Sequence, residues 1–300
     1  MRLVYFCTSG AMSLLPLQAL INVAQILAIV RPASRNAPGR QWLGHLARRV
    51  GLRQPDPIDR LARARRLPVL RASSGRDAQL LTHLQALRPE VICISTFRWL
   101  LAPDIVTLPT RGTINLHPSL LPRHRGPVPL FWIYYHNDHH TGVTIHRVSP
   151  RADAGEIMAQ AAFPIPRGFS VEQLNHTNAS HGAALLAQTV KAMEHSDIAS
   201  YPQDEALATY APIVQHGASM VRYDTWEVER VWHFLAGLWP RFREPLLSPD
   251  GSPVLYSQVL GYTVGQHRQA LGSLRPRSHG WDLHCLHGWV HLAVPAQTAW

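Results

Sequence analysis

The chain has 300 residues, of which 46% are hydrophobic and 16% are charged, so it has enough apolar material to pack two domains. Its three cysteines, Cys7, Cys93 and Cys285, lack paired or metal-ligand spacing, which excludes a disulfide framework and a zinc site. We therefore expect a cytoplasmic protein without a bound metal.

The formal charge of +10 is concentrated in one part of the chain. Residues 31–76 hold twelve arginines against Asp56 and Asp59, so this segment alone sums to +10 and the remainder sums to zero. Lys191 is the sole lysine. Two explanations stay open: contact with nucleic-acid phosphates, or the base composition of the coding DNA.

The N-terminal third alternates short apolar runs with helical patterns. The apolar stretch 14–30 carries Pro16 and Asn22 after an apolar start, which is typical of a buried helix and strand and not of a targeting segment. The expected strands are 2–7, 25–30, 68–70 and 91–96, and the expected helices are 14–24 and the segment around Leu80, Leu84 and Leu87. The Arg-rich, Pro-rich segment 31–66 predicts a long surface excursion with short helices near 43–50 and 58–65. This alternation predicts an α/β fold with a mainly parallel sheet.

The remaining elements divide the chain into two parts. Strands are expected over 112–117 and 142–148, with a helix after Pro127 and Pro129 between them. Ser170 and Gln173 form a capping-box pattern that predicts the start of a long helix. Beyond it we expect one helix over 226–238 and short strands over 253–260, 281–286 and 289–294. We predict a sheet domain over 1–205 and a smaller, barrel-like β-rich domain over 206–300.

Polar side chains mark the end of the strand predicted over 112–117. The chain has no G-x-G-x-x-G and no G-x-x-x-x-G-K run, so the usual glycine signals for dinucleotides and nucleoside triphosphates are missing. Asn115 and His117 alternate with Ile114 and Leu116, so both should project from one face of the strand. Pro118 then ends the strand.

Asp153 follows the next predicted strand. In a parallel sheet the carboxyl ends of the strands meet in one crevice, so we expect Asp153 to reach His117. An Asn, a His and an Asp supply an oxyanion donor, a group with a pKa near ~6.5 and an orienting carboxylate, which acyl transfer requires. His139, His140, His146 and His216 are expected to be surface or hydrogen-bonded core residues.

Three motifs carry a resemblance to a known family. The runs N-x-H-P-S-L-L-P-x-x-R-G at 115–126, G-V-T-x-H at 142–146 and D-A-G at 153–155 resemble the signature of the folate-dependent formyltransferases. That family includes methionyl-tRNA, amino-sugar and glycinamide ribonucleotide enzymes. The resemblance covers about 60–165, and the Y-A-P run at 210–212 is similar to the C-terminal domain of methionyl-tRNA formyltransferase. It implies a Rossmann-like formyltransferase domain, an OB-like C-terminal domain that can bind the acceptor, and 10-formyltetrahydrofolate as the formyl donor.

The resemblance also implies roles for single residues. Asn115 would hold the formyl oxygen, His117 would shuttle a proton, and Asp153 would orient His117 and help to remove the amine proton. The implied folate contacts are Ser119, Leu120, Leu121, Pro122, Ala152 and Ile157, with Phe97, Val143, Ile92 and Ser95 as further pocket walls. Arg125 has two interpretations: it binds the carboxylate or phosphate of the substrate, or it anchors the loop after the strand.

The acceptor stays open between two kinds of amine. The Arg-rich segment favours methionyl-tRNA, because arginine neutralises phosphates. An amino-sugar nucleotide or a natural-product amine is favoured by the R-A-D-A-G form of the Asp153 loop and by residues 206–300, which carry seven Arg against six acidic residues. The C-T-S-G-A-M run after the first strand also departs from the G-T-P-x-F-A run of the tRNA enzymes.

Two alternatives to transfer are a 10-formyltetrahydrofolate hydrolase and an inactive folate-binding module. The second is disfavoured because Asn115, His117 and Asp153 are all present. No membrane partner is expected.

Overall fold

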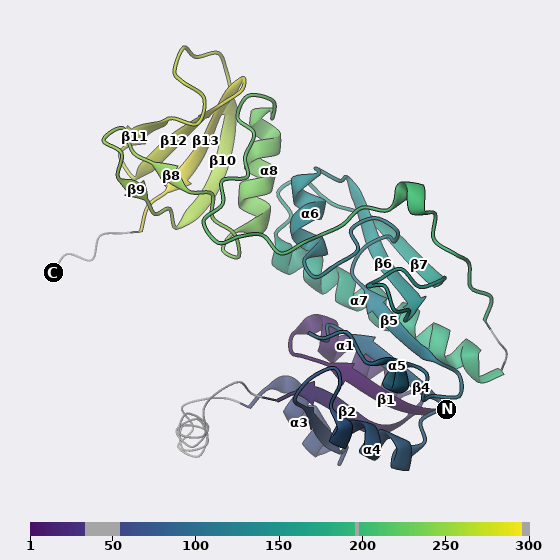
Figure 1. Cartoon of the computed structure of the whole chain (residues 1–300). Helices are drawn as coiled ribbons and strands as arrows, with labels where there is room; N and C mark the ends of the chain where they lie inside the picture. The colour runs from purple at the N-terminus through teal and green to yellow at the C-terminus, as the bar shows by residue number, and fades with distance from the viewer. Residues whose placement is uncertain (34–54, 196–197, 296–300) are drawn as a thin grey trace. The chain divides into compact units, whose positions relative to one another are not determined.

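The computed structural model describes residues 1–33, 55–195 and 198–295, so the helix expected near 43–50 lies outside it. The chain forms two compact units of interleaved segments, which Figure 1 shows by their labelled elements. Unit 1 comprises Met1–Gly126, Gly142–Ala162 and Asn175–Tyr210, and unit 2 comprises Pro127–Thr141, Phe163–Leu174 and Ala211–Trp300. The segments of the two units alternate along the chain, so the units are not separated at one position. The domain boundary that we expect between residues 205 and 206 stays a prediction.

Unit 1 is built on a seven-stranded sheet in the order β3-β2-β1-β4-β5-β6-β7. Its strands are β1 (Arg2–Cys7), β2 (Gln25–Pro32), β3 (Val69–Ala72), β4 (Val91–Ser95), β5 (Thr113–His117), β6 (His140–Arg147) and β7 (Ile157–Pro164). The first five strands in this order are parallel, and β6 runs antiparallel to β5. The expectation of a mainly parallel α/β sheet is confirmed. Strand β7 was not predicted.

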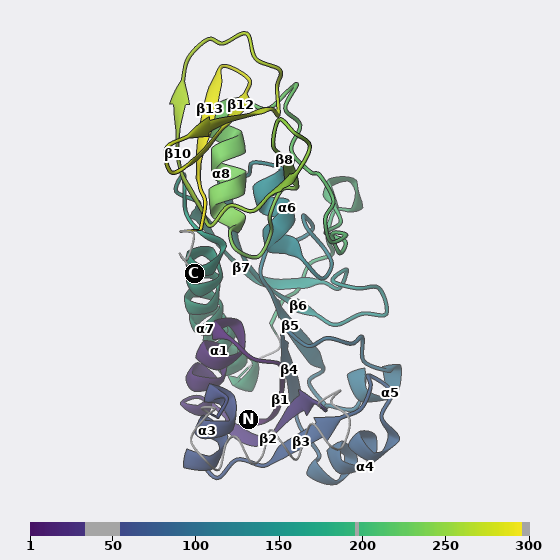
Figure 2. The same ribbon diagram turned by 90° about the vertical axis from the view of Figure 1, so that its left-hand side faces the viewer.

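Helices cover the two faces of this sheet unequally, as Figure 2 shows edge-on. One face packs on α1 (Ala11–Ile21), α3 (Pro57–Ala64) and α7 (Val171–His195), and the other on α4 (Ala78–Leu87) and α5 (Pro103–Val106). The alternation along β1 shows the two-layer burial: Leu3, Tyr5 and Cys7 join the first core, and Val4 and Phe6 join the second.

The face that carries α4 and α5 changes character at β5 and β6. Ile114 and Leu116 of β5 join the core beneath α7, and so do Val143 and Ile145 of β6. The residues that alternate with them are polar and therefore project from the opposite face: Asn115, His117, Thr144 and His146. These four polar side chains on β5 and β6 form one side of the candidate active site.

Unit 2 is β-rich, as expected. A four-stranded antiparallel sheet has the order β10-β13-β12-β11, and β8 pairs with β9. Its elements are α6 (Pro129–Tyr135), α8 (Val228–Leu238), β8 (Leu246–Leu247), β9 (Pro253–Val254), β10 (Gln258–Val264), β11 (Leu274–Arg277), β12 (Gly280–Cys285) and β13 (Gly288–Ala293). The aromatic rings of Phe131, Phe234 and Phe242 pack edge-on, so α6 and α8 share one core.

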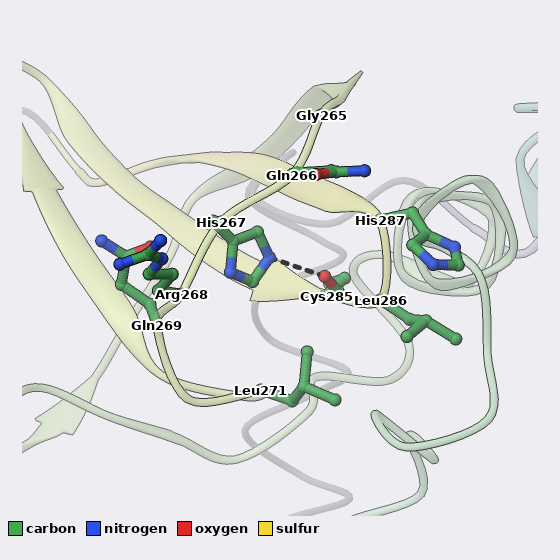
Figure 3. A pocket seen from close by; sticks show the side chains of 9 residues that line it. All are labelled: Gly265, Gln266, His267, Arg268, Gln269, Leu271, Cys285, Leu286 and His287. Atoms are coloured by element: carbon green, nitrogen blue, oxygen red, sulfur yellow. Dashed lines mark hydrogen bonds between the residues drawn. The ribbon is translucent and has the colours of Figure 1, made fainter.

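A hollow of about 410 Å³ opens on unit 2 between the 265–271 loop and the turn 285–287 (Figure 3). His267 lies on its wall and donates Nε2–H to the carbonyl of Cys285 at 2.8 Å. None of the residues predicted for catalysis or folate binding lines this hollow. Among the helices in the described ranges, none has both the length and the apolar composition needed to cross a membrane.

A substitution at Gly182 of α7 tests how closely this helix packs on β5. A Cβ placed on Gly182 would lie 2.8 Å from Cδ2 of Leu116, which is buried next to His117 on β5. We expect Gly182→Val to lower the free energy of unfolding by about 1–3 kcal/mol, because the added methyl groups overpack this contact. Urea denaturation measures the change, and Ala184→Val on the exposed side of the same helix is the control. Equal losses in both variants would show that α7 does not pack closely on β5.

Candidate active site

Asn115 and His117 lie two residues apart on β5, on the polar face of the sheet. His117 is 3% exposed, and its Nε2–H donates to the carbonyl of His124 at 2.9 Å. A neutral imidazole carries one N–H, so this bond leaves Nδ1 unprotonated. Nδ1 is 3.6 Å from Oδ1 of Asp153. The backbone carbonyl therefore selects the tautomer in which His117 can accept a proton beside a carboxylate.

Asp153 reaches the site from a different direction than expected. Because β6 runs antiparallel to β5, its carboxyl end lies next to the start of β5 and not beside His117. The loop after β6 then turns back, and Asp153 stands in it with φ +52°, a left-handed conformation that Asp tolerates better than most residues. The carboxyl ends of β5 and β6 therefore do not meet in one crevice, contrary to the prediction, although the expected proximity of Asp153 and His117 is observed.

The Asp153 carboxylate joins the loop after β5 to the strand itself. Its Oδ2 accepts the backbone N–H of Gly126 at 2.9 Å, and its Oδ1 lies 3.4 Å from the Nδ2 of Asn115. Burial opposes ionisation of Asp153, yet nearby His117 and His146 and the Gly126 amide hold its pKa well below the usual range. The carboxylate is therefore charged at neutral pH.

His146 of β6 is a site residue that the sequence analysis assigned to the surface or the core. It pairs with Asn115 across the strands, and its Nε2 lies 3.0 Å from Nδ2 of Asn115. Its Nδ1–H donates to the carbonyl of Arg147 at 2.8 Å, so Nε2 is free to accept the Asn115 amide. The alternation T-I-H along β6 was the signal: it places His146 on the same polar face as Asn115.

Arg125, a candidate for binding substrate, uses its guanidinium inside the protein instead. Its side chain is 1% exposed and donates to Oε1 of Gln203 at 2.8 and 3.0 Å and to the Glu205 carboxylate at 3.0 and 3.1 Å. The loop-anchoring interpretation of Arg125 therefore fits the contacts, and its partners are the side chains of Gln203 and Glu205.

The residues expected to contact folate separate into two groups by exposure. Phe97, Leu120, Pro122 and Ala152 are at least partly exposed. Val143, Leu121 and Ile157 are buried, as are Ile92 and Ser95, and Ser119 donates its hydroxyl to the Arg123 carbonyl at 2.7 Å. Direct folate contact fits the first group, whereas the second group supports the loops and the sheet from within.

The burial of His117 leads us to expect that the stability of the protein depends on pH. Burial lowers the pKa of His117 below its usual value, while Asp153 acts in the opposite direction. Below pH ~6.5 the unfolded chain takes up a proton that folded His117 does not, so the free energy of unfolding falls as the pH decreases toward the folded pKa. In His117→Asn this part of the pH dependence disappears.

Urea denaturation at pH 7.5 and 5.5 measures the effect in the wild type and in His117→Asn. The exposed His83 provides the matched control, His83→Asn, which keeps the wild-type difference. An unchanged pH dependence in His117→Asn would show that His117 is not held neutral by burial.

Comparison with known proteins shows the family of the chain. The family model described as formyl transferase matches residues 44–190. Methionyl-tRNA formyltransferase of Moorella thermoacetica is 34% identical over 244 residues, which cover 80% of this chain and 74% of the relative. The Microcystis aeruginosa enzyme of the same name is 27% identical over 98% of this chain and 85% of its own length.

A solved structure shows the same fold over both units. The N-formyltransferase from Helicobacter canadensis, crystallised with folinic acid and dTDP-3-aminofucose, covers 98% of this chain and 99% of its own, with a TM-score of 0.61 at 13% identity. From these matches and from its motifs, the chain belongs to the folate-dependent formyltransferase family.

Proposed function

We propose that this enzyme transfers the formyl group of 10-formyltetrahydrofolate to a primary amine at the Asn115–His117–Asp153 site. The observation that carries the proposal is the convergence of three groups: an amide donor, an imidazole with an unprotonated Nδ1, and a charged carboxylate within 3.6 Å of that nitrogen. All three belong to unit 1 of a formyltransferase.

Asn115 stabilises the negative charge that develops on the formyl oxygen. One N–H of its Nδ2 is directed to His146, which fixes the amide so that nitrogen and not oxygen faces the site. The other N–H is directed to Asp153, with Nδ2 at 3.4 Å from Oδ1, a long contact that an oxyanion can replace. A preorganised donor of this kind is worth ~2.7–4 kcal/mol of barrier.

His117 and Asp153 move the proton. As the amine nitrogen attacks the formyl carbon, Nδ1 of His117 accepts its proton, and Asp153 stabilises the imidazolium formed. The bond between the formyl carbon and N10 of the folate then breaks, and the same proton passes from His117 to N10. Tetrahydrofolate and the formamide are then released.

The folate donor contacts the exposed residues near these groups. Leu120 and Pro122 belong to the loop after β5, and Ala152 precedes Asp153 in the opposite loop. Phe97 follows β4 and packs against Phe6 at a ring distance of 5.1 Å, so its position is fixed from below. These side chains lie on the separate loops that follow β4, β5 and β6.

Methionyl-tRNA is the first candidate acceptor. Helix α3 and the residues after it present Arg60, Arg63, Arg65 and Arg66 to solvent, which suits a polyanionic partner. An amino-sugar nucleotide is the second candidate, favoured by the low net charge of residues 206–300. Both acceptors bring phosphate together with a primary amine.

Turnover assays distinguish these functions. With 10-formyltetrahydrofolate we expect tetrahydrofolate to appear only when methionyl-tRNA or an amino-sugar nucleotide is present, and Asn115→Ala to slow it about a hundredfold. Formate release without an acceptor would instead identify a hydrolase. No turnover with any acceptor would contradict the proposal, and folate binding in that case would identify the inactive binding module.

The role of His146 predicts a separate effect. In His146→Leu the Asn115 amide loses the acceptor that orients it, so we expect kcat to fall about tenfold while KM for the folate changes little. Steady-state kinetics measures both constants, and His83→Leu on the surface of α4 is the control. Wild-type kcat in His146→Leu would show that Asn115 needs no partner.

A further inference from the structure

The segment that follows α7 runs along both loops of the site. Its backbone pairs with β7, where Tyr201 and Ile157 exchange two hydrogen bonds of 2.9 and 3.0 Å. Further along, the Thr209 carbonyl accepts the N–H of Arg125 at 2.9 Å, and its hydroxyl accepts the N–H of His124 at 2.9 Å. This segment, residues 201–210, lies beyond the part of the chain matched by the family model, which ends at residue 190.

Gln203 connects the two loops through one buried side chain that is 9% exposed. Its Nε2 donates to the carbonyls of Asp153 at 2.8 Å and Gly155 at 2.7 Å. Its Oε1 accepts two hydrogen bonds from Arg125, at 3.0 and 2.8 Å. A side chain in this place needs two donors at one end and an acceptor at the other, which an amide supplies and a carboxylate or an ammonium does not.

The partner network keeps the Gln203 amide in this orientation. The buried guanidinium of Arg125 also contacts Glu205, which in turn accepts Arg151 Nη2 at 2.8 Å. Arg125 presents only N–H groups, so Gln203 must direct its oxygen to Arg125 and its nitrogen to the Asp153 loop. Arg125 and Glu205 therefore set which end of the amide faces Asp153.

Asp153 depends on this contact because its backbone is in a left-handed conformation and its carboxylate must face His117. Gly126 holds the carboxylate through its N–H, and Gln203 holds the backbone carbonyl of the same residue. Gly126 directly follows Arg125, which binds Gln203. Both contacts therefore hold Asp153 against the same loop, the one after β5. A displacement of about 1 Å at a catalytic group can lower the rate a hundredfold.

We propose that Gln203 is a positioning residue, which fixes the Asp153 loop against the Arg125 loop so that the carboxylate stays beside Nδ1 of His117. This inference rests on the proposed function, because the group that it positions is the proposed partner of the proton-transferring imidazole. Gln203 itself does not touch the substrate.

Two substitutions test it. Gln203→Met keeps the length of the side chain and removes every hydrogen bond, whereas Gln203→Glu keeps an acceptor for Arg125 and removes both donors to the Asp153 loop. We expect each to lower kcat about tenfold to a hundredfold with little change in the KM of the folate. The control is Asp204→Asn, at the neighbouring residue whose side chain caps the N–H of Ala206.

A double-mutant cycle separates positioning from a general loss of structure. If Gln203 acts through Asp153, Gln203→Met has almost no further effect on kcat in an Asp153→Asn background. If the two effects multiply, Gln203 does not act through Asp153 and the inference is overturned. Wild-type kcat in Gln203→Glu would overturn it as well.

A readout without turnover keeps this test independent of the proposed function. Asp153 raises the pKa of His117, so displacement of its carboxylate in Gln203→Met should shift the NMR titration of the His117 ring to lower pH, with His117→Asn identifying the signal. An unshifted titration contradicts the inference even if no acceptor supports turnover. If the wild type is inactive with every acceptor but Gln203→Met still shifts the His117 titration, only the proposed function is contradicted.

Discussion

The Asp153 carboxylate is the charge around which the site is arranged. A carboxylate taken out of water is unfavourable unless donors contact it, and here the Gly126 and Asn115 amides do so. The imidazole rings of His117 and His146 lie beside it, 3.6 and 3.5 Å from Oδ1. The same contacts bring the strand, the loop after it and the returning loop together. Neutral His117 then has its basic nitrogen beside a fixed negative charge, which is the arrangement that proton transfer from an amine requires.

In the part of the chain that the structure describes, the apolar core beneath α4 and α5 does not extend over β5 and β6, and this makes the arrangement possible. Over β1 and β4 both faces are buried, whereas over β5 and β6 the face opposite α7 carries Asn115, His117, Thr144 and His146. The loops that follow β5 and β6 contact this face, through the His124 carbonyl at His117 and the Asp153 carboxylate at Asn115. They also meet residues 201–210, so a segment remote in sequence supports the catalytic groups.

Most of unit 1 could be predicted from the sequence because periodicity is a local property. Strand β1 was predicted at its observed bounds, and helix α1 was placed three residues late at both ends. Strand β7 was missed because its small residues, A-Q-A-A, give no alternation. The direction of β6 was also missed, since strand direction is set by pairing. The importance of His146 depends on Asn115, its partner on the neighbouring strand. The importance of Gln203 depends on Gly155 and Asp153, which are 48 and 50 residues away in the sequence.

The most direct test of formyl transfer at this site is a crystal structure of the enzyme with folinic acid, a stable formylated folate. We expect the ligand to lie against Leu120, Pro122 and Phe97, with its formyl group within reach of the Asn115 amide and Nδ1 of His117. A folate bound away from Asn115 and His117, for example in the hollow of unit 2 beside His267, would contradict it.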